Sequence, residues 1–536
     1  MKTLLIGVNA KYIHPNLAIR LLKANTKYQC DIIEYTIKDS IDNIYNYIID
    51  NKYEFVGFSV YIWNVNLINE LLYKLKDTNI KILLGGPEVS YNTKYYFDNE
   101  LCDYIIKNEG EEAFDKLLAY LHNDFNLLDI PNLYYKDGYT FDKLVDINSI
   151  KPAYDLLDNV DNKIIYLETS RGCPYHCSYC MASLDNKVRF FDINMIKEEI
   201  LKLNKRGAKV IKLLDRTFNA NKKNFIELID FIIANRVLGQ SYQFEITGDL
   251  LSLDLIDYIN ERAPKHLFRF EIGIQSTNIK ANLSVRRIQN NEKLFTNIRR
   301  IQDADIIDLH LDLIAGLPYE DYDSFKNTFN EVVSLKPKEL QLGFLKLLHG
   351  TQLKIEAECY NYKYMDKAPY EIISNDFMSE NDIHNIHIAE DAFETYYNSM
   401  VLPLTNKYLI DNYPSMYDIY YNVGLLDFKR KPLEDRYKIF NDYFINYKDY
   451  NKIHELIIID YLNYYNVKPK AWWMEKLSKE DKNNTLRLIV DNNMLNYTLD
   501  TLYRNSLVIP LEDKYIVVIY KDNKKEINFV NKINLC

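Results

Sequence analysis

Few cysteines and no long apolar run characterise this chain of 536 residues. Its 7 cysteines are too few and too unevenly spaced for a disulfide scaffold, which favours a reducing, cytoplasmic environment. No segment approaches the run of about 18 apolar residues that a membrane-spanning helix needs, so we expect no membrane insertion. The net charge of −10 argues against a nucleic-acid backbone as the main partner.

Glycine is also scarce, with 15 residues, and only Gly424 lies beyond position 350. Glycine is needed where the backbone adopts a positive φ or approaches a ligand closely. We therefore expect ligand binding in the part of the chain before residue 350, and a separate domain at 351–536.

Residues 1–125 alternate between short apolar segments and segments with helical spacing. This alternation predicts a doubly wound, Rossmann-like α/β domain whose parallel sheet binds ligands at the carboxyl ends of its strands. No Gly-x-Gly-x-x-Gly motif follows the first strand, which argues against a dinucleotide. The predicted strands are Leu4–Val8, Asp31–Tyr35, Phe55–Tyr61, Lys81–Leu84 and Tyr104–Ile106.

A second alternation of strands and helices occupies residues 163–350, after an irregular connector at 126–162 with a predicted hairpin near Lys136–Gly138. Its six strand–helix units correspond to three-quarters of a (β/α)8 barrel, so we expect a partial, TIM-like (β/α)6 barrel. The last segment, 351–536, has mostly helical spacing and a terminal hairpin. The predicted barrel strands are Ile164–Glu168, Lys209–Leu214, Tyr242–Thr247, Leu267–Ile274, Ile306–Ile314 and Glu339–Leu345.

Polar and apolar residues alternate along these barrel strands. In Asp308–Leu313 the three leucines share one face and the polar residues share the other. The apolar face must pack against the helices, so the polar face lines the lumen. Glu245, His310 and Asp312 lie on the polar face and are candidates for holding a substrate or moving a proton. The alternative is hydrogen bonding within the barrel wall, without substrate contact.

Three cysteines form the most informative motif, Cys173-x3-Cys177-x2-Cys180. Three thiolates in one loop are a soft ligand set suited to iron–sulfur clusters or zinc. A cluster with three protein ligands leaves one iron open for chemistry. Zinc is the alternative, with His176 as a fourth ligand, but His176 is adjacent to Cys177 and too cramped to complete a tetrahedron easily.

With this motif and the barrel that follows it, the chain resembles the radical S-adenosylmethionine (radical SAM) superfamily. The resemblance implies that the cysteines hold a 4Fe–4S cluster whose open iron binds SAM. Asp215 and Thr217 follow the second strand, where the family has the Gly-Gly-Glu segment that receives the SAM amino group; the two glycines are absent here. The resemblance further implies SAM contacts from Gln275 and Ser276 (ribose), Arg287 (carboxylate, with Arg286 one register away) and Gly316 (adenine).

The N-terminal domain resembles the cobalamin-binding domain that many radical SAM enzymes carry. Ser59, Gly85 and Gly86 match positions that contact the nucleotide tail of cobalamin in that domain. The Asp-x-His-x-x-Gly motif, which supplies a lower cobalt ligand in some relatives, is absent. His14 is a candidate ligand, but Pro15 beside it marks a helix start and favours a structural role.

The resemblance implies a cobalamin-dependent radical SAM methyltransferase that acts on an unactivated carbon. In that family the reduced cluster cleaves SAM to methionine and a 5′-deoxyadenosyl radical, which removes a substrate hydrogen before methyl transfer from methylcobalamin. The alternatives are a cyclase or rearrangement enzyme with the same cofactors, and a non-catalytic cobalamin or cluster sensor. We expect a small-molecule or peptide substrate, and an electron donor such as flavodoxin or ferredoxin.

Overall fold

The computed structural model describes residues 1–157, 159–466, 477–521 and 524–532. The chain forms two compact units: residues 1–328 with 340–383, and residues 329–339 with 384–536. The first unit contains the N-terminal α/β domain and the barrel apart from residues 329–339, and it contains every residue predicted to bind a cofactor. The division at Ile383 lies beyond the predicted domain boundary at residue 350, which stays a prediction.

The N-terminal domain contains a sheet of seven strands in the order β2-β1-β3-β4-β5-β6-β7. Strands β1 to β5 are parallel, as predicted, whereas β6 and β7 form an antiparallel hairpin in the predicted connector. The bounds are β1 Thr3–Asn9, β2 Asp31–Thr36, β3 Phe55–Ser59, β4 Lys81–Gly85, β5 Tyr104–Ile106, β6 Leu133–Tyr135 and β7 Gly138–Tyr139.

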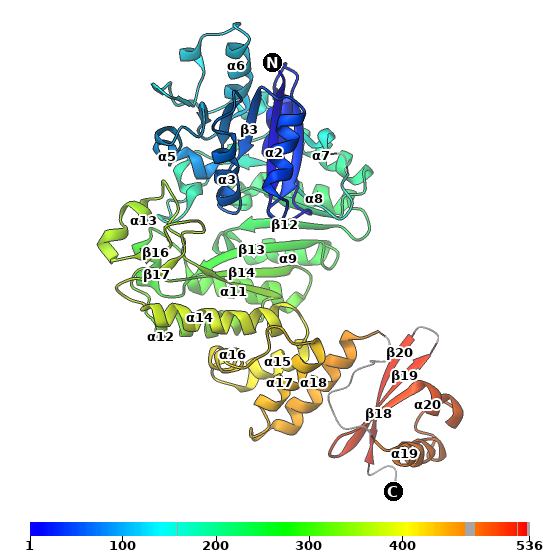
Figure 1. The fold of residues 1–536 in the computed structure, drawn as a ribbon. Coiled ribbons are helices and arrows are strands. Elements are labelled where there is room, and N and C mark those ends of the chain that lie inside the picture. The colour runs from blue at the N-terminus through cyan, green and yellow to red at the C-terminus, as the bar shows by residue number, and fades with distance from the viewer. Residues whose placement is uncertain (158, 467–476, 522–523, 533–536) are drawn as a thin grey trace. The chain divides into compact units, whose positions relative to one another are not determined.

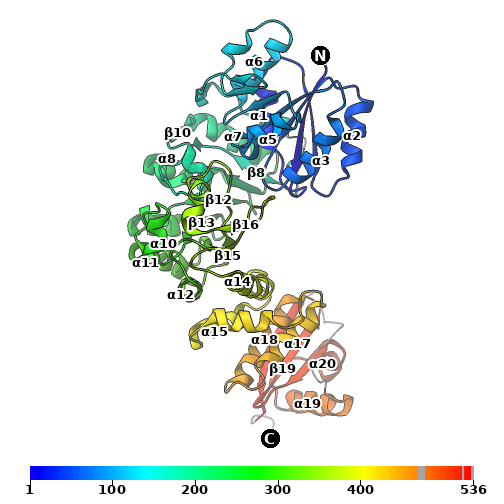
Figure 2. The same ribbon diagram turned by 60° about the vertical axis from the view of Figure 1, so that its left-hand side comes forward.

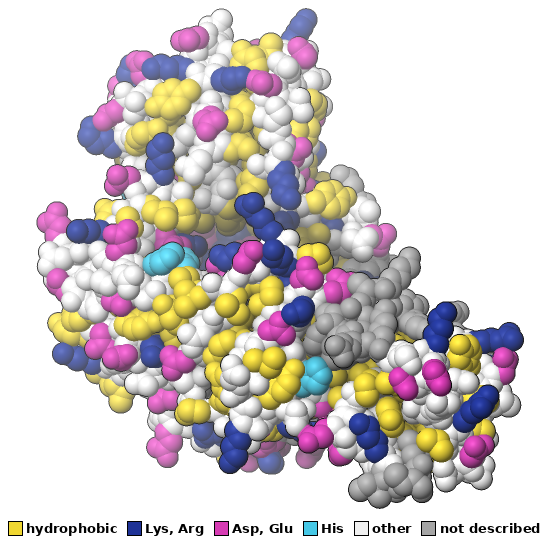
Figure 3. All heavy atoms as spheres, turned by 60° about the horizontal axis from the view of Figure 1, so that its bottom comes forward, with side chains coloured by type: hydrophobic (Ala, Val, Ile, Leu, Met, Phe, Trp, Pro, Cys, Tyr) yellow, Lys and Arg dark blue, Asp and Glu magenta, His cyan; other side chains and the backbone are white. Residues whose placement is uncertain are grey.

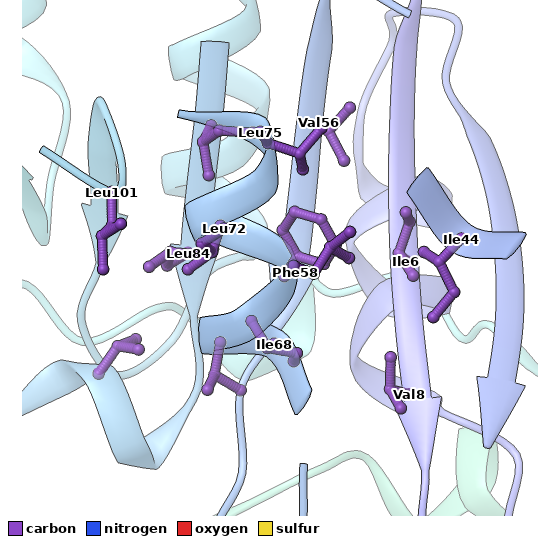
Figure 4. Packing of buried hydrophobic residues seen from close by; sticks show 14 of the residues in the cluster. Ile6, Val8, Ile44, Val56, Phe58, Ile68, Leu72, Leu75, Leu84 and Leu101 are labelled. Carbon is purple, nitrogen blue, oxygen red and sulfur yellow. The ribbon is translucent and has the colours of Figure 1, made fainter. Parts of the chain in front are cut away.

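Helices cover both faces of this sheet, which confirms the doubly wound prediction. Helices α1 (Leu17–Asn25) and α6 (Glu111–Leu121) contact each other on one face. Helices α2 (Ile41–Asp50) and α3 (Val65–Leu75) cover the other, where α3 packs its apolar stripe against the strands (Figure 4). Each fully buried Leu or Ile side chain in such a layer stabilises the fold by about 1.5–3 kcal/mol. The short helices α4 (Pro87–Ser90) and α5 (Thr93–Asp98) follow β4.

The second sheet has six strands in the sequential order β8-β11-β12-β13-β14-β15 (Figure 1, Figure 2). Neighbours from β8 to β14 pair in parallel, and β8 and β15 are the two edges, so the barrel is open as predicted. The strands are β8 Ile164–Leu167, β11 Val210–Leu213, β12 Ser241–Ile246, β13 Phe268–Gln275, β14 Asp308–Ala315 and β15 Glu339–Phe344. The helices between them are α7 Ile193–Lys205, α8 Lys222–Asn235, α9 Leu253–Arg262, α10 Ile279–Ser284, α11 Asn291–Ala304 and α12 Tyr322–Val333.

The alternation of residue types in the barrel strands determines which side chains are buried. Along β13, Phe268, Phe270, Ile272 and Ile274 are buried, while the residues between them are half-buried. The aromatic members pack against neighbouring rings of β12 and α8. Because successive side chains point to opposite faces, the polar residues are left to the lumen.

Short elements surround the barrel. Strands β9 (Ser170–Arg171) and β10 (Arg189–Phe190) pair antiparallel and close the loop that contains the three cysteines. After β15 come α13 (Gln352–Ile355) and the strand pair β16 (Lys363–Tyr364) and β17 (Ile372–Ser374).

The second compact unit is mostly helical, as predicted, and ends in an antiparallel sheet of three strands. The predicted hairpin corresponds to β18–β19; the third strand, β20, was not predicted because its charged and polar residues obscure the apolar alternation. The elements are α14 Glu380–Phe393, α15 Pro403–Asn412, α16 Met416–Gly424, α17 Leu433–Tyr443, α18 Tyr450–Tyr464, α19 Lys479–Asp491, α20 Leu499–Asn505, β18 Ser506–Pro510, β19 Lys514–Lys521 and β20 Lys524–Asn531. Among the residues described, no helix is long and apolar enough to cross a bilayer.

Candidate active site

The three cysteines lie in one loop that leaves the carboxyl end of β8. Cys173 and Cys177 are buried and Cys180 is half-buried. Gly172 precedes them with φ = +89°, and a Cβ there would lie 2.5 Å from the carbonyl oxygen of Lys187. Only glycine fits this close approach, so the loop returns tightly against its own base.

The barrel holds the loop from its other side. The backbone N–H of Ser178 donates to the carbonyl of Val285 (2.9 Å), and the N–H of Leu353 donates to the carbonyl of Ser178 (2.8 Å). Two predicted SAM-binding side chains lie beside the thiols: Thr217 Oγ1 is 3.8 Å from Cys173 Sγ, and Arg287 Nη1 is 4.0 Å from Cys177 Sγ.

The two adjacent arginines differ sharply in environment. The Arg287 guanidinium is held by the Gly273 carbonyl and by Gln289 Oε1, beside the cysteine loop. Arg286 has a side chain 56% exposed, and its guanidinium is 3.3 Å from Glu356. The structure therefore brings Arg287, and not Arg286, to the cysteines.

Asp215 supports the strand that leads into the cysteine loop. Its carboxylate accepts hydrogen bonds from the Thr169 N–H (3.0 Å), the Thr169 hydroxyl (2.6 Å) and the Ser170 hydroxyl (2.5 Å). Burial raises the pKa of Asp215 to about 6, although these donors act in the opposite direction. Its contact with the SAM amino group stays a prediction.

The remaining predicted SAM contacts lie on tight turns. Gln275 has φ = +68°, and its side chain folds back so that a Cβ on Gly273 would meet its Nε2 at 2.2 Å. Gly316 has φ = +91° and packs against Ile372. Ser276 is fully buried and donates to Glu320 Oε1 (2.5 Å). The roles of these residues toward the ribose and adenine stay predictions.

Glu320 was not predicted from the sequence, and it gives a pH-dependent test of this region. It is fully buried, and burial raises its pKa from 4.5 to about 7, with hydrogen bonds from Ser276 and Thr328 acting against the rise. The folded state therefore binds the Glu320 proton more tightly than the unfolded chain does. The stability that protonated Glu320 contributes is present below pH 4.5 and is lost as the pH rises to about 7. We expect Glu320→Gln to remove about 2–3 kcal/mol of the difference in unfolding free energy between pH 5 and pH 8.

Chemical denaturation at pH 5, 6, 7 and 8 measures this difference. The control is the same substitution at an exposed position of α9, Glu261→Gln. Parallel profiles for the wild type and Glu320→Gln would contradict the assignment.

The three predicted catalytic residues lie on the polar face of the barrel strands, where His310 and Asp312 contact each other and Glu245 contacts Arg216 instead. Arg269 Nη2 donates to His310 Nδ1 (2.5 Å), so His310 Nε2 carries a proton that faces Asp312 Oδ1 (3.1 Å). Glu245 lies 3.9 Å from Arg216; burial raises the pKa of Glu245, and the arginine opposes this rise. The carboxylates of Glu245 and Asp312 are each 32% exposed, so both face the open lumen.

An additional ion pair crosses the lumen. Lys212 Nζ, on β11, lies 2.7 Å from Glu271 Oε2, on β13. Lys212 escaped the sequence reasoning because its strand is short, although the alternation in Val210–Leu213 places it on the polar face. The lumen is therefore lined by groups of both charge signs.

At the carboxyl edge of the N-terminal sheet, the predicted cobalamin contacts have different environments. Ser59 Oγ accepts a hydrogen bond from Asn16 Nδ2 (2.8 Å). Gly85 has open space at its Cβ position, with only the Ile106 carbonyl within 4 Å, at 3.8 Å. Tyr61 and Trp63 follow β3 and stack at 4.3 Å, and Trp63 is 46% exposed. An exposed aromatic face next to an open glycine suits a flat, apolar ligand such as a corrin.

His14, which follows β1, is held by a contact with the barrel. Its Nδ1 lies 2.6 Å from the hydroxyl of Tyr166, on β8, and the two rings stack at 6.0 Å. Burial, and then Lys11 and Lys212, lower its pKa, so the ring is held neutral in a structural contact between the two sheets. This agrees with the structural alternative for His14.

Gly86 gives a test of the sheet edge that separates backbone strain from steric contact. Its φ is +109°, and a Cβ would lie 2.4 Å from the Val60 carbonyl oxygen. Gly207 has a similar φ of +82° with no heavy atom within 4 Å of the Cβ position. We expect Gly207→Ala to cost about 1 kcal/mol of unfolding free energy, and Gly86→Ala to cost roughly 3 kcal/mol or more. Denaturant titration measures both, and equal costs would contradict the steric argument.

The donor set fits an iron–sulfur cluster. Among the residues described, no three His, Cys, Asp or Glu side chains are arranged around one point as for a single metal ion. A cubane with three cysteine ligands does not need that arrangement, because each thiolate binds a different iron. The half-buried Cys180 and the buried Cys173 and Cys177, with Arg287 beside them, are the residues that would hold it.

Family models define the class of protein. Residues 167–332 match the radical SAM superfamily, and residues 3–118 match the B12 binding domain. Residues 358–513 match a protein of unknown function, DUF4080. The chain therefore carries a B12-binding domain followed by a radical SAM domain, and the resemblance inferred from the sequence is confirmed.

Individual relatives agree with this class. The chain is 30% identical over 168 residues to the uncharacterized methyltransferase PH0819 of Pyrococcus horikoshii, covering 28% of this chain and 36% of that protein. It is 22% identical over 348 residues to the cobalamin-dependent radical SAM methyltransferase TokK of Streptomyces tokunonensis, covering 59% of this chain and 50% of TokK. The chain thus spans half or less of these two curated relatives.

A solved structure shares the fold. The cobalamin-dependent SAM radical enzyme OxsB, with aqua-cobalamin and SAM bound, superposes with a TM-score of 0.58 at 14% identity. The match covers 93% of this chain and 82% of OxsB. The predicted arrangement of a cobalamin-binding fold and a partial barrel in one chain is confirmed.

Proposed function

We propose that the chain is a cobalamin-dependent radical SAM methyltransferase that methylates an unactivated carbon. The observation that carries the proposal is the joining of a three-cysteine loop and a B12-binding domain in one compact unit. The similarity to TokK, a cobalamin-dependent radical SAM methyltransferase, supports methyl transfer.

Three groups of residues have distinct tasks in this proposal. When bound, the reduced 4Fe–4S cluster and SAM supply a radical that removes a substrate hydrogen atom, and cobalamin supplies the methyl group. Cys173, Cys177 and Cys180 hold the cluster, and the forked guanidinium of Arg287 binds the SAM carboxylate beside them. The buried apolar faces of the barrel strands pack away from the lumen and leave the polar side chains to line it.

The lumen carboxylates bind and orient the substrate. Glu245 and Asp312 are acceptors that face the lumen, so they select hydrogen-bond donors on the substrate. His310 Nδ1 accepts a hydrogen bond from Arg269, and His310 Nε2 lies 3.1 Å from Asp312 Oδ1, so the ring is placed beside this carboxylate. The substrate itself is a small molecule or a peptide.

The reaction also needs a one-electron donor, for which a flavodoxin or a ferredoxin has the required chemistry. We place the reaction in the cytoplasm, where thiols and the cluster stay reduced.

On the face that Figure 3 shows, outside its grey atoms, acidic and basic side chains are interspersed rather than gathered into a basic stripe. That a nucleic acid is not the main partner stays a prediction, made from the net charge of −10.

Anaerobic reconstitution with iron, sulfide and hydroxocobalamin tests the proposal. We expect about four irons and about one cobalamin per chain after desalting. On reduction, SAM should yield 5′-deoxyadenosine, and a labelled SAM methyl group should appear on cobalamin. SAM cleavage without methyl transfer to cobalamin would favour a cyclase or rearrangement enzyme. A loaded cluster that never cleaves SAM would favour a sensor, and zinc in place of iron would overturn the proposal.

A further inference from the structure

A buried carboxylate of the N-terminal domain binds both ends of the cysteine loop. Glu109 lies just after β5, at the carboxyl edge of the sheet, and its side chain is 11% exposed. Its Oε1 is 3.2 Å from Arg171 Nη1 and 2.9 Å from Arg189 Nη2. Its Oε2 accepts from Arg189 Nη1 (3.0 Å) and from the backbone N–H of Val145 (2.8 Å). Three of these contacts are hydrogen bonds, and the contact with Arg189 Nη2 is an ion pair.

The two arginines are the base of the cysteine loop. Arg171 and Arg189 face each other across the β9–β10 pair, and the residues between them include all three cysteines. Arg171 is two positions before Cys173, and both guanidinium side chains are 12% exposed. A change at Glu109 therefore acts on both ends of the loop at once.

Other carboxylates complete the charge balance without replacing Glu109. Arg171 also contacts Glu111 (2.6 Å) and Glu168 (2.9 Å), and Arg189 also contacts Asp185 (2.8 Å). Glu168 and Asp185 belong to the barrel and to the loop itself, and Glu111 contacts only Arg171 among the two arginines. Among these carboxylates, Glu109 alone binds both arginines.

We infer that Glu109 is a positioning residue for the iron–sulfur cluster. Through Glu109, the cobalamin-binding edge of the N-terminal sheet sets the conformation of the cysteine loop. This inference rests on the proposed function only in naming the two cofactors. Glu109 follows Ile106 by three residues, and the Ile106 carbonyl faces the open Cβ position of Gly85. We expect a ligand bound at this edge to favour the loop conformation that binds the cluster. By linkage, the two ligands then strengthen each other's binding by the same factor.

The first experiment measures iron loss from the reconstituted holoprotein to a chelator. We expect Glu109→Gln to accelerate iron loss at least about tenfold, because a hydrogen bond to a charged group contributes more than the free energy equivalent to one decade. The EPR signal of the reduced cluster should also broaden. Arg189→Lys keeps the charge but cannot bind both oxygens, so it should give an intermediate rate.

Glu112→Gln is the matched control. Glu112 is three residues away, in the first turn of α6, and also binds two cations, Lys116 (2.8 Å) and Lys143 (2.7 Å). These two lysines are not the arginines that flank the cysteine loop, so iron loss from Glu112→Gln should remain at the wild-type rate. Equal rates in Glu109→Gln and the wild type would overturn the inference, even if the thermal midpoint of the variant falls.

The second experiment measures the affinity for hydroxocobalamin with and without the cluster. The wild type should bind more tightly when the cluster is present, and Glu109→Gln should reduce that ratio towards one. A ratio unchanged by the substitution would contradict the coupling.

A third measurement separates this inference from the proposed function, because it uses metal-free protein. Lys187 is exposed within the loop, and trypsin should cleave after it faster in Glu109→Gln than in the wild type or Glu112→Gln. Faster cleavage would support the positioning role even if methyl transfer fails, and equal cleavage in all three proteins would refute it.

Discussion

Cys177→Ala is expected to abolish SAM cleavage, lowering the rate of 5′-deoxyadenosine formation by at least about a thousandfold, or about 4 kcal/mol in activation free energy. Cys177 is buried at the centre of the loop, beside the half-buried Arg287, so its loss removes one of three cluster ligands and leaves this cation facing a gap. Iron content after reconstitution and the yield of 5′-deoxyadenosine on reduction measure the effect.

Cys359→Ala is the control for this experiment. Cys359 is an exposed free thiol outside the cysteine loop, so its removal should change neither iron content nor SAM cleavage. If Cys177→Ala retained full iron and full cleavage, the three-cysteine loop would not be the cluster site. If both variants lost iron equally, the iron would be bound non-specifically.

The barrel and the cysteine loop were predictable because their signals are local. The alternation in Asp308–Leu313 depends only on neighbouring residues, and it gave both the strand and the face that Asp312 and His310 share. The spacing of the cysteines likewise lies within one short segment. In both cases short-range geometry determines the outcome, so a single sequence is sufficient.

The contacts between the two sheets were not predictable in the same way. Glu109 and Arg189 are 80 residues apart, and nothing local in either segment indicates that they meet. The pairing of Ser276 with Glu320, 44 residues away, has the same character. Such pairs depend on how whole elements pack, which propensity and periodicity do not encode.

Asp215 shows how a correct position can have an unexpected environment. The sequence placed it at the end of the second barrel strand, where it lies, but its oxygens face Thr169 and Ser170 of the neighbouring segment. Because Asp215 accepts three hydrogen bonds from these two residues, it stabilises the backbone that leads into the cysteine loop. Backbone and hydroxyl donors carry no sequence signal that distinguishes this arrangement from a ligand contact.

The choice between Arg286 and Arg287 was also beyond the sequence, and the structure turns it into a matched pair of substitutions. We expect Arg287→Lys to weaken SAM binding by about a hundredfold, since the guanidinium binds two acceptors and a thiol neighbour at once and an ammonium cannot reproduce this geometry. The measurement is the SAM concentration dependence of 5′-deoxyadenosine formation, together with iron content.

Arg286→Lys should leave SAM binding within about twofold of the wild type, because its exposed guanidinium forms a surface pair with Glu356 and lies away from the cysteines. Iron content separates two causes of any loss in Arg287→Lys. Full iron with a raised SAM requirement would support a contact with SAM, whereas lost iron would mean that Arg287 chiefly stabilises the loop around Cys177. If instead Arg286→Lys raised the SAM requirement and Arg287→Lys did not, Arg287 would be a structural group and its assignment to the SAM carboxylate would be wrong. Because the two residues are adjacent and receive the same substitution, the difference between them reports position alone.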